Sequence, residues 1–112
     1  SLIMTLTTEN CHVIADLCIV PVGKDVSTSK YIIEVQNVLQ ETGLKTNLHA
    51  CGTNIEGKFD QIMSAIQKCI NKVHELGVAR IDTTIRLQTR TDKSMTIKDS
   101  INAVNEVVPS KQ

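Results

Sequence analysis

Aromatic side chains are nearly missing from this sequence of 112 residues. One Phe, one Tyr and no Trp make up 2% of the chain, whereas 41% of the residues are hydrophobic, so aliphatic side chains must build nearly all of the core. Modules that bind single-stranded nucleic acid need several aromatic faces on which bases can stack. The scarcity of rings therefore argues against an RRM-like module or a similar nucleic-acid platform.

An excess of charge of either sign is also missing, since 12 Lys and Arg residues balance 12 Asp and Glu residues. Such a chain has no overall field that would gather phosphates or anionic lipids. No apolar run approaches the roughly 18 residues of a membrane span, and the N-terminus lacks the order of a secretory signal. We therefore expect a cytoplasmic protein that binds neither nucleic acid nor membranes.

Motifs for metals, phosphates and nucleophilic catalysis are absent as well. The four cysteines, Cys11, Cys18, Cys51 and Cys69, form no CxxC pair, so a structural zinc site has no support and reduced thiols are expected. The chain contains no Gly-rich phosphate loop, no GxSxG and no HExxH. The sequence thus predicts no metal site and no cofactor.

A regular succession of β-like and helical patterns is present instead. Strands are indicated by β-rich or alternating runs bounded by glycine, and helices by apolar residues at helical spacing, with Thr96 and Asp99 resembling a capping box before the last helix. Gly52 either separates two short strands or bends a single one. The predicted order is strand, helix, strand, strand, helix, strand and helix, over residues 12–22, 27–43, 44–51, 53–56, 59–76, 79–90 and 96–108.

This order predicts an α+β fold, the ferredoxin-like βαββαβ sandwich, in which a four-stranded antiparallel sheet carries two helices on one face, with a C-terminal helix in addition. We expect one domain over residues 12–108, after a flexible tail over residues 1–11 that could include an expression remnant. The other sheet face would expose Ile14, Cys18 and Val20. Either a second subunit packs on it sheet to sheet, or the last helix folds across it.

Two carboxylates stand out in these strands. Asp16 interrupts an apolar register of the first strand, where a buried carboxylate needs a partner, and Arg86 in the neighbouring strand could supply an ion pair; a ligand role for Asp16 is the alternative. Glu56 precedes Gly57 and the long helix. It could cap that helix, or it could direct a hydrogen-bond acceptor into a cleft.

His49 and Cys51 are the one Cys/His pairing suited to nucleophilic chemistry. Residues two apart in a strand point outward in parallel, which is a poor geometry for a thiol and its base unless the chain bends at Gly52. A structural role is the favoured interpretation, and an enzyme using Cys51 or His49 stays open. The polar turn of residues 90–93 is interpreted as a solvated loop, with anion binding as the alternative.

Three segments together resemble the thiamine-binding, YkoF-like proteins, a family of small ferredoxin-like proteins. They are DLCIVPVG at residues 16–23, LHACGTNIEG at residues 48–57 and IRLQTRTDK at residues 85–93. The resemblance spans about residues 12–105. It implies a sheet-to-sheet dimer that pairs into a tetramer, and binding of thiamine or its aminopyrimidine part without catalysis.

An aminopyrimidine offers ring nitrogens and an exocyclic amine, which match carboxylate, hydroxyl and amide partners. The candidate ligand contacts are Glu56 and Thr53 first, then Asn54, Asp16 and Arg86, near the open sheet face or a subunit interface. A register shift of one residue at Gly52 would exchange the faces of the nearby side chains. A structural or regulatory homo-oligomer that binds no small molecule is the competing hypothesis.

Overall fold

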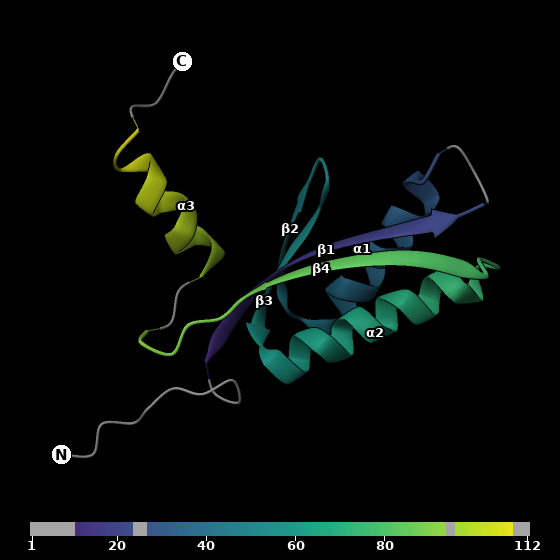
Figure 1. The fold of residues 1–112 in the computed structure, drawn as a ribbon, viewed down its shortest axis with the longest axis horizontal. Coiled ribbons are helices and arrows are strands. Elements are labelled where there is room, and N and C mark those ends of the chain that lie inside the picture. The colour runs from purple at the N-terminus through teal and green to yellow at the C-terminus, as the bar shows by residue number, and fades with distance from the viewer. Residues whose placement is uncertain (1–10, 24–26, 94–95, 109–112) are drawn as a thin grey trace.

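Seven elements follow one another along the chain (Figure 1). The computed structural model describes residues 11–23, 27–93 and 96–108. The expected order of strands and helices is confirmed, and the elements are β1 (His12–Val22), α1 (Ser29–Thr42), β2 (Lys45–His49), β3 (Gly52–Lys58), α2 (Phe59–Glu75), β4 (Arg80–Gln88) and α3 (Ile97–Asn105). None of these helices is long and apolar enough to cross a membrane.

The four strands form one antiparallel sheet in the order β2-β3-β1-β4, which confirms the predicted ferredoxin-like topology. β1 is central, as its two apolar faces indicated, and Asp16 in it lies opposite Asn54 of β3 and Arg86 of β4. β2 and β3 form the hairpin around residues 50 and 51. β3 runs two residues past the predicted end at Glu56. At Gly57 the Leu44 side chain takes up the space of a side chain, since its Cδ2 would lie 2.9 Å from an added Cβ.

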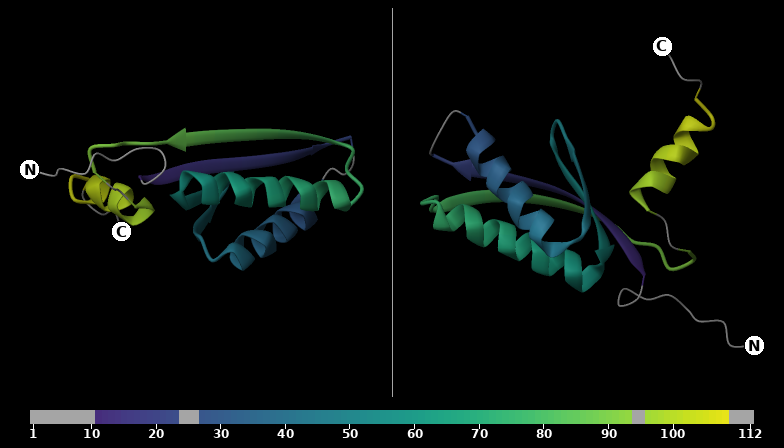
Figure 2. Two further views of the ribbon diagram at one scale, coloured as in Figure 1. Left: turned by 90° about the horizontal axis from the view of Figure 1, so that it is seen from below. Right: turned by 180° about the vertical axis from the view of Figure 1, so that it is seen from behind.

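Helices α1 and α2 cover one face of the sheet and enclose the core (Figure 2). Of the two residues with a benzene ring, Tyr31 is buried and Phe59 is partly buried against the core, as expected for Phe59. Cys11, which we assigned to the N-terminal tail, is fully buried in this core; residues 1–10 of that predicted tail lie outside the described part. The remaining buried core side chains are aliphatic or cysteine: Val13, Ala15, Leu17, Val35, Leu39, Ile55, Ile62, Ala65, Ile66, Cys69, Val73 and Val78.

Both ends of α1 follow from local sequence. Thr28 is the residue that precedes the helix, and its backbone carbonyl accepts hydrogen bonds from the N–H groups of Tyr31 and Ile32. Its hydroxyl makes no capping bond, and a side chain caps the helix one residue earlier, where Ser27 Oγ accepts the Ser29 N–H at 3.5 Å. Gly43, with φ 74°, ends the helix in the left-handed conformation that glycine adopts at little cost.

The opposite sheet face is left uncovered by the described elements except at Glu56, which the start of α3 meets, and Val20 on this face is 45% exposed. α3 lies past the end of the sheet rather than across this face, so the second of the two coverings considered above is not the one adopted (Figure 1). The predicted capping box of α3 is present, with Thr96 Oγ1 accepting from the Asp99 N–H and Asp99 Oδ2 accepting from the Thr96 N–H. None of the α3 side chains is buried.

Candidate functional site

The five predicted ligand contacts do not gather at one place, because β3 presents successive side chains to opposite faces of the sheet. Thr53 points to the helix-covered face and is 4% exposed. Asn54 and Glu56 lie on the open face with Asp16 and Arg86, to which they are related by the strand register. The two residues that the sequence favoured most, Thr53 and Glu56, are therefore on different sides of the sheet.

Thr53 lies in a cleft of about 190 Å³ between the start of α1, the second half of β1 and the β2–β3 turn. The Nε2 group of Gln36 in α1 donates a hydrogen bond of 2.9 Å to Thr53 Oγ1. The walls are mainly apolar, and Tyr31 places one of the two rings of the chain there. No Lys or Arg is among the described residues that line the cleft.

Gln36 is a site residue that the sequence did not predict. It follows Val35, a buried residue of α1, and reaches Thr53 over a separation of 17 residues. The available signal was weak, because a single polar residue beside a buried helical stripe is common on solvated helices. Only the packing of α1 on β3 brings the amide to the hydroxyl.

On the open face, the side-chain partner of Asp16 is His49 rather than Arg86. His49 Nε2 lies 2.6 Å from Asp16 Oδ1, and Asn54 Nδ2 donates to the same oxygen at 3.5 Å. The expected Asp16–Arg86 pair is not formed in the described part of the chain, although the two residues are direct partners in the register. Both donors come from the β2–β3 hairpin, and they draw the carboxylate away from β4.

A second, shallower depression of about 390 Å³ lies on the same open face. Asp16, Asn54 and Arg86 line it together with side chains of β1 and β4. It therefore holds three of the five predicted contacts, which offer a carboxylate, an amide and a guanidinium.

His49 uses both of its ring nitrogens. The backbone N–H of Cys51 donates to Nδ1 at 3.3 Å, so Nδ1 carries no hydrogen and Nε2 carries the one donated to Asp16. Cys51 itself is exposed. In this geometry neither nitrogen of His49 is free to accept a proton from the Cys51 thiol, which a Cys/His nucleophile would require.

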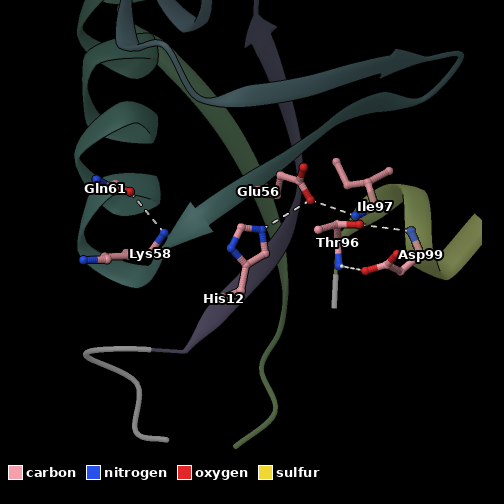
Figure 3. Close-up of polar contacts among 7 residues, drawn as sticks. All are labelled: His12, Glu56, Lys58, Gln61, Thr96, Ile97 and Asp99. Atoms are coloured by element: carbon pink, nitrogen blue, oxygen red, sulfur yellow. Dashed lines mark hydrogen bonds and ion pairs between the residues drawn. The ribbon is translucent and has the colours of Figure 1, made fainter. Parts of the chain in front are cut away.

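Glu56 is 6% exposed, and its carboxylate caps a helix other than the one expected. Oε2 accepts the N–H of Ile97 at 2.7 Å and lies 3.3 Å from His12 Nε2 (Figure 3). The Ile97 N–H is one of the unsatisfied donors at the start of α3, so the capping interpretation was right in kind and wrong in naming the long helix. At the start of α2 the Gln61 Oε1 accepts instead, from the Lys58 N–H at 3.2 Å.

The surroundings of three further groups shift their pKa values. Burial raises the pKa of the Cys69 thiol to about 11, so this cysteine stays protonated at neutral pH. In the polar turn after β4, the hydrogen bond from Arg90 lowers the pKa of Asp92 to about 2, and the same bond raises the pKa of Arg90. No group of three or more His, Cys, Asp or Glu side chains that could hold a metal ion occurs in the described ranges.

Sequence comparisons identify relatives along nearly the whole of this fold. A UPF0045 protein of Synechocystis sp. is 45% identical over 93 residues, which cover 83% of this chain and 77% of that protein. A UPF0045 protein of Eremothecium gossypii is 41% identical over 96 residues, which cover 85% and 91% of the two chains.

Solved structures agree with the fold. A hypothetical protein of Methanocaldococcus jannaschii superimposes with a TM-score of 0.79 at 33% identity, covering 85% of this chain and 97% of that one. A Thermotoga maritima protein, provisionally named for thiamine biosynthesis or salvage, gives a TM-score of 0.73 over 84% and 99% of the two chains. At 17% identity the latter supports the fold alone.

The family assignment rests on the length of the match. The sequence model described as "Thiamine-binding protein" matches residues 15–105, a range that runs from β1 into the last turn of α3 and includes the cleft, the Asp16–His49 pair and Glu56. Together with the relatives above 40% identity, this match leads to one conclusion: the chain belongs to the thiamine-binding protein family.

Proposed function

We propose that this chain is a non-catalytic binding protein for thiamine, and that the aminopyrimidine ring of thiamine occupies the cleft beside α1. The observation that carries the proposal is the Gln36–Thr53 hydrogen bond within an otherwise apolar cleft. Small-molecule sites commonly combine apolar walls with a few fixed polar groups. A chain of the thiamine-binding protein family offers that combination here.

The free hydrogen-bonding capacity of the pair suits an aminopyrimidine. Once Gln36 Nε2 donates to Thr53 Oγ1, the Thr53 hydroxyl hydrogen can still be donated to a ring nitrogen. The Gln36 carbonyl oxygen can accept from the exocyclic amine. Tyr31 and the aliphatic walls provide apolar contact for the flat ring.

The size and charge of the cleft agree with partial enclosure of thiamine. Its volume of about 190 Å³ accommodates a single ring, since sites for drug-sized ligands span about 300–1,000 Å³. The thiazolium would then lie outside. A lining without Lys or Arg among its described residues offers no cationic partner to a phosphate, and it tolerates a cation.

We further propose that copies of the chain pair sheet to sheet and that two pairs form a tetramer. The support is the open face, on which Val20 is 45% exposed and which the described helices leave uncovered except where the start of α3 meets Glu56. Aliphatic surface of this kind is stabilised by a second sheet packed against it. Light scattering coupled to gel filtration measures the mass directly, and a monomer at micromolar concentration would contradict this part.

Titration calorimetry with thiamine and with hydroxymethylpyrimidine tests the ligand. We expect both to bind, and Thr53→Val to weaken binding about tenfold, because it removes the hydroxyl and nearly preserves the shape. Gln36→Leu should act similarly. Absence of any binding heat at millimolar thiamine would rule the function out.

The depression on the open face is the second candidate site, because Asp16, Asn54 and Arg86 line it. In a sheet-to-sheet dimer it would be enclosed between subunits. Arg86→Ala and Asn54→Ala are therefore the matched controls for Thr53→Val. If these two variants lose binding and Thr53→Val does not, the ligand occupies the open face instead of the cleft.

A further inference from the structure

The β2–β3 turn forms one wall of the cleft, and one imidazole fastens it. Ala50 and Cys51 of the turn line the cleft, together with His49 and Gly52 at its two ends. The Cys51 N–H donates to His49 Nδ1 at 3.3 Å. This bond is the contact that joins the turn backbone to the ring.

The ring is in turn fixed to the centre of the sheet. Its Nε2 donates to Asp16 Oδ1 at 2.6 Å, and Asp16 belongs to β1, the central strand. The two bonds together require one tautomer, with the hydrogen on Nε2. In the other tautomer, the hydrogen on Nδ1 would face the Cys51 N–H, and Nε2 would have no hydrogen to donate to Asp16.

Gly52 lies directly beside the imidazole. Gly52 is the strand partner of His49, and a Cβ on it would lie 3.3 Å from His49 Cε1 and 3.2 Å from Asp16 Oδ1. The same Cβ would come within 2.7 Å of the Leu17 carbonyl oxygen. Because Gly52 has no side chain, there is room beside it for His49 to reach Asp16.

We propose that His49 is a positioning residue of the ligand cleft, which it shapes by holding the Cys51 backbone while Asp16 holds His49. The proposal rests on the cleft being the ligand site. His49 acts on the ligand through the turn, and the residues that bind the aminopyrimidine ring of the ligand are Thr53 and Gln36. Asp16, which the sequence predicted as a ligand contact, then serves the cleft from the other face of the sheet.

Two amide substitutions separate the two bonds of the ring. The side-chain oxygen of Asn lies close to the position of Nδ1, so His49→Asn keeps an acceptor for the Cys51 N–H and loses the reach to Asp16. The side-chain nitrogen of Gln lies close to the position of Nε2, so His49→Gln keeps the donor to Asp16 and loses the acceptor. His49→Ala loses both.

Calorimetric titration with thiamine and amide hydrogen exchange at Cys51 give the readouts. We expect His49→Ala and His49→Gln to weaken thiamine binding about tenfold and to speed exchange of the Cys51 N–H, whereas His49→Asn stays within about threefold of the parent in both. His74→Ala is the matched control, because His74 also makes a short hydrogen bond, 2.7 Å to the Val78 carbonyl, and neither residue lines the cleft. It should leave both readouts unchanged.

The outcomes divide cleanly. If His49→Asn binds as weakly as His49→Ala, or His49→Gln binds as the parent does, His49 does not act through the turn and the proposal is wrong. If the parent protein binds no thiamine, the proposed function fails, and Cys51 exchange across the same variants still decides whether His49 holds the turn. Ring ¹⁵N shifts provide an independent check: we expect the Nε2–H tautomer for His49, and a Nδ1–H tautomer would overturn the proposal.

Discussion

Helices α2 and α3 are both amphipathic, yet they differ completely in what they bury. α2 packs Ile62, Ala65, Ile66, Cys69 and Val73 into the core, whereas α3 leaves Ile101 and Val104 of its stripe 49% and 59% exposed. Isolated helices shorter than about 12 residues are marginal in water, and α3 has nine. Its helical form therefore depends on contacts at its first turn, which are the capping box and the hydrogen bond to the Glu56 carboxylate.

The comparison teaches that an apolar stripe predicts a helix more surely than it predicts where that helix packs. α2 follows directly from β3, so the short connection and its stripe carry it onto the sheet. α3 is instead directed by a single carboxylate at its first turn, 41 residues away in sequence. Packing holds one helix and polar contacts at one end hold the other.

Removing one methyl-rich side chain from each helix should give the largest contrast. Ile62→Ala empties a fully buried position and should lower the free energy of unfolding by about 2–5 kcal/mol. Ile101→Ala, the matched change in α3, should stay within about 0.5 kcal/mol, because its side chain is 49% exposed. Urea denaturation measures both, and equal losses would show that α3 packs on something in solution.

Glu56→Gln should give an intermediate effect that is confined to α3. The amide keeps an acceptor for the Ile97 N–H but loses the charge that strengthens the bond, a difference of about 1 kcal/mol. Amide exchange in α3 should accelerate while exchange in α2 stays as it was. Asp60→Asn, a change of the same kind at the first turn of α2, is the control, and accelerated exchange in α2 after Glu56→Gln would contradict the assignment.

The smallest effect is expected from pH. The backbone N–H of Thr96 donates to the Asp99 carboxylate and holds the pKa of Asp99 below its ordinary value. A carboxyl whose pKa is lower in the folded helix stabilises it above the ordinary value, and this contribution is lost as the pH falls through the lowered value. Secondary chemical shifts should therefore show α3 fraying in acid, with α2 unaffected. Asp99→Asn should reduce that dependence.

The sequence predicted the architecture because the architecture depends on local patterns. Alternation, glycine stops and helical spacing are properties of neighbouring residues, and the doubly apolar β1 indicated its own central place. The same holds for the Thr96–Asp99 capping box. Even the separation of Thr53 from Glu56 follows from alternation, because the predicted strand of residues 53–56 already contains both.

The site could be predicted only in part, because its contacts join distant segments. Asp16 was identified as a carboxylate that needs a partner, but the choice between Arg86 and His49 depends on how the hairpin closes over Gly52. Gln36 carried no signal that distinguished it from other polar residues of α1. Such pairs depend on how different elements pack against one another. The spacing of residues within one element does not predict that packing.

Strand β3 assigns four consecutive residues to four different surroundings. Thr53 lies in the cleft, Asn54 beside Asp16, Ile55 in the core and Glu56 against the start of α3. Substitution at any one of them alters one neighbourhood only. Insertion or deletion of a single residue would change the surroundings of all four residues at once. The strand therefore tolerates substitutions better than a change in its length.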